Sequence, residues 1–405
     1  MPVICDSSIP HRLGVFNAEN IREKATAVVS EPYTGPSRVY PKFDYPFPCF
    51  QGEPILMRET PAARGILFQR PHKTGSTTMV GIILRLVHNR AKMHQGEAKF
   101  GKKFDKCKHR TMHGKAKNYQ YGKRDLSKSF LFSIIRDPTA RTISQFFHFD
   151  VAAYEKEPTD DTFRTMARSG NFNYYLMELS TRQYVPNGTL VSDLDFAKSM
   201  GYAGVNQCDL AMRSREPGPT QLLRRQRVSS KEFGLNYDPK RVVQDILDDY
   251  NFIAIMERMD ESLVVFQMLL GLTTKEILYT RARSSGSFFN GWHGRPCIYI
   301  MKSFLTPGMK AYFESEEWKL TIANDILMYQ AANESLDRTI ASLDPAEFTK
   351  NMAALKRGLN LAGEICKGKI RPVCTEGGVE IPLPNRTCFI WSEGCDHACI
   401  DAVQL

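Results

Sequence analysis

Three segments of the chain repeat one order of elements: a short apolar run, a polar turn and a helix with one apolar face. The apolar runs are Gly65 to Gln69, Phe130 to Ile135 and Phe252 to Met256. After the first run and a polar turn, apolar residues recur at helical spacing, namely Met79, Ile82, Ile83, Leu86 and Val87. Short apolar strands that alternate with helices are typical of a parallel sheet flanked by helices. The pattern therefore predicts an α/β fold.

The remaining patterns divide the chain into three parts. Residues 1–61 are rich in proline and lack a periodic apolar pattern, so they are predicted to be an irregular arm. Residues 62–345 are predicted to form the folded domain, including one long helix from Glu314 to Ile340 that packs on the sheet. Within this domain, Val151 to Leu247 carries a weaker signal and is interpreted as insertions on the substrate side. Residues 346–405 are predicted to be a cysteine-rich tail.

The tail holds five of the ten cysteines: Cys366, Cys374, Cys388, Cys395 and Cys399. This density favours disulfide bonds formed in an oxidising compartment. Two alternatives stay open. One is that the thiols are free. The second is a zinc site at Cys388, Cys395, His397 and Cys399, although their spacing lacks a paired C-x-x-C pattern. The sequence also has three N-x-S/T sequons, at Asn187, Asn333 and Asn385, which would agree with a secretory glycoprotein.

Composition and charge narrow the class of protein. The 405 residues are 42% hydrophobic and 24% charged, as in a folded globular chain. No apolar stretch reaches the roughly 18 residues of a membrane span, and no signal peptide is visible, so an anchor, if the protein has one, lies outside this sequence. The net charge is +10, and Lys99 to Lys128 holds eleven Lys or Arg against two Asp. This segment is interpreted as a solvated loop or as a surface for an acidic partner. No nucleic acid is expected, because no nucleic-acid motif accompanies the charge.

The loop from Arg70 to Thr78 joins the first strand to its helix. Free backbone N–H groups and the helix dipole favour an anion at such a helix N-terminus, so the loop is predicted to bind phosphate. It is not a Walker A loop, because Lys73 precedes the single glycine, Gly75. A polar turn capped by Ser or Thr is the structural alternative.

The second strand-to-helix unit adds Arg136 at the strand end and Ser144 eight residues later, with Arg141 between them. An arginine and a hydroxyl suit a second phosphate on the same nucleotide. Alternatively, Arg136 forms an ion pair with Asp137 or Glu257.

These motifs resemble a known family. The segment RPHKTGSTT (Arg70 to Thr78) is similar to the 5′-phosphosulfate loop of membrane-bound carbohydrate sulfotransferases, and IIRDPTARTISQFF (Ile134 to Phe147) is similar to their 3′-phosphate motif. The segment ERMDESLVV (Glu257 to Val265) and the helical segment that begins at EWKL resemble the galactose-3-O-sulfotransferase and cerebroside sulfotransferase group. The resemblance spans Gly65 to Ile340 and implies the sulfotransferase fold, with a P-loop-like central sheet.

The resemblance implies 3′-phosphoadenosine 5′-phosphosulfate (PAPS) as the donor, with adenosine 3′,5′-bisphosphate as its product and no metal. Lys73 and the loop residues Thr74, Gly75, Ser76, Thr77 and Thr78 are then expected on the phosphosulfate, and Arg136 and Ser144 on the 3′-phosphate. Sulfuryl transfer resembles phosphoryl transfer, in which catalysis depends on positioning and on charge stabilisation, so Lys73 is also the expected catalytic cation.

The transfer also needs a general base that deprotonates the acceptor hydroxyl, and histidine is the usual choice. His72 matches a histidine of the galactose-sulfotransferase motif, and His113 resembles a histidine of uronyl 2-O-sulfotransferases. Both stay open as catalytic candidates, whereas His148 is expected to be structural. Glu257 or Glu178 would be the carboxylate alternative.

The acceptor is the least determined part. The resemblance implies a hydroxyl of a carbohydrate or glycolipid in the Golgi lumen or secretory pathway, and the basic segment is compatible with an acidic glycan. The absence of a visible anchor leaves a cytoplasmic location open, and with it a sulfotransferase of a small natural product. Two competing hypotheses are a P-loop kinase, disfavoured by the missing Walker A motif, and a non-catalytic nucleotide- or glycan-binding protein of the same fold.

Overall fold

The computed structural model describes eleven parts of the chain. They are residues 33–43, 65–95, 110–169, 174–182, 238–280, 286–289, 297–369, 374–375, 377, 379–381 and 398–405. The chain divides into two compact units, Met1–Thr34 and Gly35–Leu405. All helices and strands described in the following paragraphs belong to the second unit.

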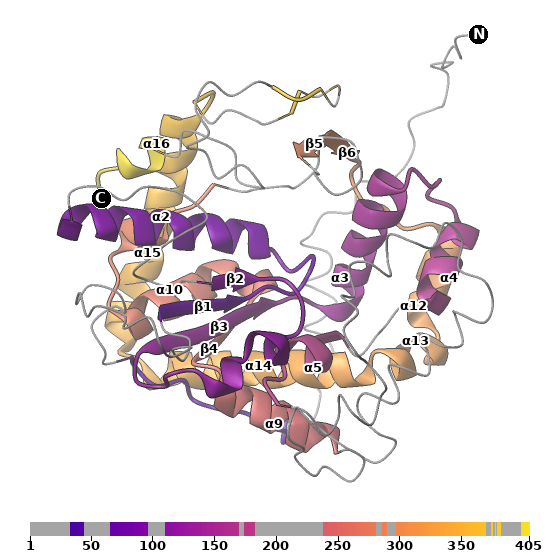
Figure 1. The fold of residues 1–405 in the computed structure, drawn as a ribbon, viewed down its shortest axis with the longest axis horizontal. Coiled ribbons are helices and arrows are strands. Elements are labelled where there is room, and N and C mark those ends of the chain that lie inside the picture. The colour runs from indigo at the N-terminus through magenta and orange to yellow at the C-terminus, as the bar shows by residue number, and fades with distance from the viewer. Residues whose placement is uncertain are drawn as a thin grey trace, which may run out of the picture. The chain divides into compact units, whose positions relative to one another are not determined.

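A four-stranded parallel sheet forms the centre of this unit (Figure 1). Its strands are β1 (Gly65–Gln69), β2 (Arg110–Met112), β3 (Ser129–Ile135) and β4 (Phe252–Ile255), in the spatial order β2-β1-β3-β4. Every residue of β1, β3 and β4 is buried, which is why these strands read as continuous apolar runs. The α/β fold with a parallel sheet is confirmed. Strand β2 was not predicted, because its sequence, RTM, has no apolar run.

Each predicted strand leads into a helix. These helices are α2 (Ser76–Gln95) after β1, α3 (Pro138–Gln145) after β3, and α10 (Met259–Leu270) shortly after β4. The start of α3 is encoded locally: the Asp137 side chain accepts a hydrogen bond from the Ala140 N–H at 2.8 Å, and Pro138 occupies the first turn. Since β1 and β3 are parallel neighbours, the loops that precede α2 and α3 lie at one edge of the sheet.

The prediction of one long helix from Glu314 to Ile340 is wrong. The structure has three helices there, α12 (Pro307–Glu314), α13 (Glu316–Thr321) and α14 (Ala323–Ser342). Ser315 is extended and its side chain accepts from the Trp318 N–H at 3.2 Å, so it caps a new helix rather than continuing the old one. Helix α14 does pack against β4, as expected, and Figure 1 shows it beside that strand.

Further helices cover the neighbouring region. They are α4 (Asp160–Ser169), α5 (Tyr174–Leu179), α9 (Pro239–Asp249) and the short α11 (Thr274–Ile277). Residues 146–153 form a π-helical segment directly after α3. Among the described residues, α4 and α5 lie within the span Val151 to Leu247, whose sequence signal was weak, and α9 begins within it.

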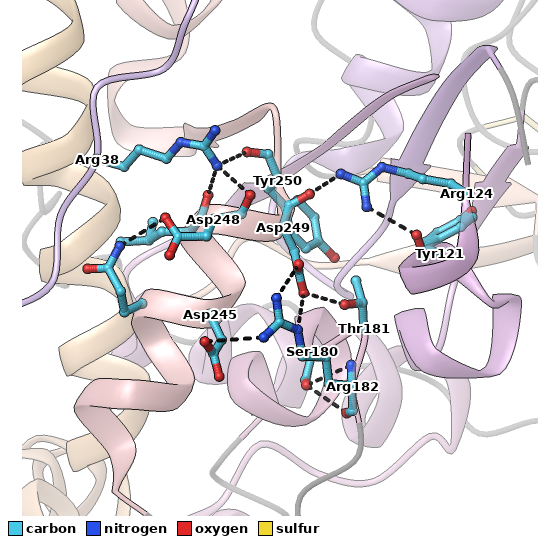
Figure 2. Close-up of polar contacts among 12 residues, drawn as sticks. Arg38, Tyr121, Arg124, Ser180, Thr181, Arg182, Asp245, Asp248, Asp249 and Tyr250 are labelled. Carbon is cyan, nitrogen blue, oxygen red and sulfur yellow. Dashed lines mark hydrogen bonds and ion pairs between the residues drawn. The ribbon is translucent and has the colours of Figure 1, made fainter. Parts of the chain in front are cut away.

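Arginine side chains contact the C-terminal end of α9, as Figure 2 shows. Arg38 donates from Nη1 to the carbonyl oxygens of Leu247, Asp248 and Tyr250. Arg124 donates to the Asp249 carbonyl, and Arg182 pairs with the Asp249 carboxylate at 2.9 Å. Cations at a helix C-terminus satisfy its open carbonyls and its dipole. Arg124, a member of the basic segment, is therefore buried and structural.

Two disulfide bonds hold the C-terminal region. Cys366, at the end of α15 (Pro345–Cys366), is bonded to Cys399 in α16 (Ala398–Asp401). Cys374 is bonded to Cys297 in the hairpin of β5 (Gly286–Phe289) and β6 (Cys297–Ile300). The preference for disulfides is confirmed for these cysteines, and Cys399 is not a zinc ligand. Cys388, Cys395 and His397 lie outside the described residues.

Within the described ranges, no helix combines the length and apolar character needed to cross a membrane. The sequons at Asn187 and Asn385 and the segment Lys99 to Lys108 lie outside those ranges. The third sequon, at Asn333, lies in α14, where its amide donates to the Tyr329 carbonyl at 3.3 Å.

Candidate active site

The loop between β1 and α2 turns sharply enough to present the start of the helix at the sheet edge. Lys73 and Gly75 both have positive φ, of 65° and 76°. The Thr74 hydroxyl donates to the Pro71 carbonyl at 2.9 Å, and the Gly75 carbonyl accepts from the Thr78 N–H at 3.1 Å. The loop is thus held in shape by its own polar groups, and α2 begins at Ser76. This is the strand, loop and helix N-terminus that phosphate binding requires.

Burial divides five of the six predicted donor-binding residues of this loop into two groups. Thr74 and Ser76 are buried, and the Thr74 hydroxyl bonds within the loop. Lys73, Thr77 and Thr78 are half-buried at the loop and in the first turn of α2, where they border solvent. Gly75 lies close to the residue that follows β4, because an added Cβ would be 3.2 Å from the Met256 Cγ. Any larger residue there would displace either the loop or Met256.

Arg136 lies beside this loop. Its Nη1 donates to the Lys73 carbonyl oxygen at 3.4 Å, so the residue predicted for the 3′-phosphate contacts the loop predicted for the 5′-phosphosulfate. Its Nε is also 3.9 Å from the Glu257 carboxylate, so the alternative ion pair is present too. Glu257 accepts from the Asp137 N–H at 3.1 Å and from the Tyr329 hydroxyl at 3.1 Å. Burial raises the pKa of Glu257, since it disfavours the charged carboxylate.

Ser144 and Arg141 lie on α3, which begins beside Arg136. Ser144 is half-buried near the far end of that helix, and its pairing with Arg136 on one phosphate stays a prediction. Arg141 is 2% exposed, with its guanidinium 4.1 Å above the Tyr174 ring and 3.8 Å from the Asp325 carboxylate. Its guanidinium is thus enclosed by α5 and α14, and a contact of Arg141 with a phosphate stays a prediction.

The two candidate histidines lie face to face. The rings of His72 and His113 are parallel within 1°, with their centroids 4.1 Å apart. His113 is exposed and its Nδ1 is 2.8 Å from the Arg70 carbonyl oxygen. A carbonyl only accepts, so Nδ1 carries the proton and the neutral ring has its basic lone pair on Nε2. The tautomer of His113 is therefore set by the same loop that carries Lys73.

His72 has a different environment. It is half-buried, and its backbone N–H donates to the Tyr174 hydroxyl at 2.8 Å. Burial, together with the charges of Arg70, Lys73 and Arg141, lowers the pKa of His72 to about 4. His148, expected to be structural, is buried in the π-helical segment with its ring against Phe149.

Helix α5 contributes three further side chains near these loops, Tyr174, Tyr175 and Glu178. Of these, the sequence analysis named only Glu178. Tyr174 and Tyr175 hydrogen-bond to the two loops predicted to bind the donor, and no motif marks them. Glu178, the carboxylate alternative for the base, is 7% exposed, and burial raises its pKa to about 8. In the part of the chain that the structure covers, no group of three or more His, Cys, Asp or Glu is arranged to hold a metal ion.

Comparison with known proteins agrees with this geometry. Residues 61–191 match the model of the sulfotransferase family. That range contains both strand-to-helix loops, His113 and helix α5. No curated protein matches the chain significantly. The family match supports a sulfotransferase domain over residues 61–191 and therefore a sulfotransferase enzyme.

Proposed function

We propose that this sulfotransferase transfers a sulfuryl group from PAPS to a hydroxyl of a carbohydrate or glycolipid. The observation that carries the donor assignment is the contact between the two loops, in which the Arg136 guanidinium lies 3.4 Å from the Lys73 carbonyl. Two cationic side chains and a helix N-terminus at one sheet edge suit a ligand that carries two separate anionic groups.

The residues present fit such a donor. Gly75 lets the loop adopt a positive φ and pack on Met256, next to the N–H groups of the first turn of α2. Lys73 and those N–H groups would hold the 5′-phosphosulfate, and Arg136 with Ser144 would hold the 3′-phosphate. When bound, PAPS supplies the sulfuryl group and leaves as adenosine 3′,5′-bisphosphate. Lys73 stabilises the negative charge that develops on the leaving side.

His113 is the better candidate for the general base. Its Nδ1–H is held on the Arg70 carbonyl, which directs its basic lone pair to Nε2, the atom that would take the proton of the acceptor hydroxyl. His72 is a weak base, because its pKa is lowered to about 4. We assign His72 to packing against the His113 ring and to the backbone contact with Tyr174.

The acceptor and the compartment are proposed on separate grounds. The carbohydrate or glycolipid acceptor follows from the motif resemblance, and the two disulfide bonds support an oxidising compartment such as the Golgi lumen or secretory pathway. The alternatives are a small natural product as acceptor, or donor binding without turnover. A screen of hydroxyl acceptors with labelled donor separates these three.

The donor is tested first, by calorimetric binding of adenosine 3′,5′-bisphosphate, AMP and ATP. We expect the bisphosphate to bind at least tenfold tighter than AMP, and Arg136→Ala to abolish most of this preference. Lys73→Ala should weaken both ligands, because both carry a 5′-phosphate. Arg338→Ala is the matched control, since exposed Arg338 pairs with Glu334 on its own helix. Tighter binding of ATP, or equal binding by Arg136→Ala, would refute the donor assignment.

A further inference from the structure

Two successive tyrosines at the start of α5 contact the two donor-binding loops separately. The Tyr174 hydroxyl accepts from the backbone N–H of His72 at 2.8 Å, in the loop after β1. The Tyr175 hydroxyl accepts from the backbone N–H of Arg136 at 3.0 Å and donates to the carbonyl of the same residue at 2.5 Å. One short helix therefore holds the backbone of both loops.

The two hydroxyls differ in how they bond. The Tyr174 hydroxyl accepts from the His72 N–H. Tyr175 exchanges two hydrogen bonds with Arg136 and is 0% exposed. A phenol hydroxyl can donate one hydrogen bond and accept through its lone pairs, and Tyr175 uses both roles. These are directed contacts, which fix backbone positions more closely than apolar packing does.

Helix α5 is itself held from two sides. Asp325, on α14 and 0% exposed, accepts from the backbone N–H groups of Tyr174 at 3.2 Å and Tyr175 at 2.9 Å. Arg141, from α3, places its guanidinium 4.1 Å from the Tyr174 ring and 5.5 Å from the Tyr175 ring. The tyrosines are thus anchored to two neighbouring helices, and Figure 1 shows α5 beside α14.

We propose that Tyr174 and Tyr175 are positioning residues that set the spacing of the two donor-binding loops, Tyr174 for the 5′-phosphosulfate loop and Tyr175 for the 3′-phosphate residue Arg136. This inference rests on the proposed donor. It adds a division of roles: loss of each hydroxyl affects a different part of the same ligand. Neither side chain needs to touch the donor, because each acts through the backbone of its loop.

The test replaces each tyrosine by phenylalanine, which removes one hydroxyl and keeps the ring. In Tyr175→Phe we expect affinity for adenosine 3′,5′-bisphosphate to fall three- to tenfold, while affinity for AMP changes less than twofold. In Tyr174→Phe we expect both affinities to fall by a similar factor, so that their ratio is kept. Tyr250→Phe is the matched control, because the buried Tyr250 hydroxyl also donates to a backbone carbonyl of α5, that of Leu179, at 3.0 Å.

Amide hydrogen exchange supplies a readout that does not depend on the donor. Tyr174→Phe should speed exchange in the segment with His72, and Tyr175→Phe in the segment with Arg136, each without affecting the second loop. Equal effects of both variants on both loops, or the same effects in Tyr250→Phe, would overturn the inference and indicate a general loss of stability. A wild-type protein that does not prefer the bisphosphate to AMP would instead refute the proposed donor, while the exchange data still decide whether the tyrosines hold the loops.

Discussion

The imidazole rings of His72 and His113 are stacked 4.1 Å apart, yet their surroundings give them different chemistry. His113 is exposed and donates from Nδ1 to the Arg70 carbonyl, whereas burial and nearby cations lower the pKa of His72 to about 4. A base with so low a pKa is poorly matched to proton transfer near neutrality. Of the two stacked rings, His113 is therefore the candidate base, and His72 packs against it.

Replacing His113 should affect turnover far more than donor binding. His113→Asn keeps an N–H for the Arg70 carbonyl but removes the base, so we expect kcat/KM to fall about 100-fold or more. Affinity for adenosine 3′,5′-bisphosphate should change less than twofold. The measurements are initial rates with an acceptor from the screen, and calorimetry with the bisphosphate.

The pH profile of kcat/KM distinguishes the two histidines independently. If His72 were the base, its acid limb would lie near pH 4. We expect the limb well above that pH, and we expect His72→Asn to retain most of the turnover. An acid limb near pH 4 that is lost in His72→Asn would assign the base to His72 instead.

Substituting Gly75 should damage the donor loop beyond the ordinary cost of a positive φ. In Gly75→Ala the new Cβ would meet the Met256 side chain at 3.2 Å, in a residue with φ of 76°. Left-handed backbone alone costs about 1–2 kcal/mol for alanine. We expect at least this loss in the free energy of unfolding, together with weaker binding of adenosine 3′,5′-bisphosphate, measured by urea denaturation and calorimetry.

Gly271→Ala is the control for the backbone effect. Gly271 has φ of 60° at the end of α10, and a Cβ there would meet nothing within 4 Å. This variant should lose stability by a similar amount and bind the bisphosphate as the wild type does. If Gly75→Ala also left binding unchanged, close packing of the loop on Met256 would have no role in donor binding.

Glu178 should make the stability of the fold depend on pH. Its pKa is raised by burial from 4.5 to about 8, so between these values the unfolded chain has lost a proton that the folded chain keeps. The free energy of unfolding therefore falls as pH rises through this window, by at most ~1.4 kcal/mol per pH unit from this group. Glu178→Gln should remove this dependence and be more stable than the wild type at pH 8, but not at pH 4.5. Parallel denaturation curves at both pH values would contradict the assignment.

The tail should stabilise the helix that begins at the donor loop. Arg85 of α2 is 5% exposed, and its Nη1 donates to the Asp401 carboxylate at 2.9 Å, which also accepts from Asn89 at 2.8 Å. Asp401→Ala would leave a buried guanidinium without its counter-charge, so we expect a loss of about 1–3 kcal/mol. The control is Glu316→Ala, which breaks an exposed pair with Lys319 and should cost less than ~1 kcal/mol. Equal losses in thermal denaturation would show that the Arg85 contact adds no special stability.

Local sequence patterns determined the elements that precede the site. The strands around Ile66, Phe132 and Ile253 are buried on both faces, and burial of that kind requires the continuous apolar runs by which they were predicted. Asp137 and Pro138 mark the start of α3 because capping involves only neighbouring residues. The strand, loop and helix around Arg70 to Thr78 were predictable for the same reason.

Contacts between distant residues decided the rest. Tyr174 is 102 residues from His72, and no local pattern signals a hydrogen bond that arises only when α5 packs against α14 and α9. The stacking of His113 on His72 depends on β2 pairing with β1, and β2 has no apolar signature. The burial of Arg141 depends likewise on Asp325 from α14. The sequence by itself determined which loops join a strand to a helix N-terminus, because that property is local. Only the tertiary structure decided which side chains position those loops, because strand order and helix packing bring such residues together.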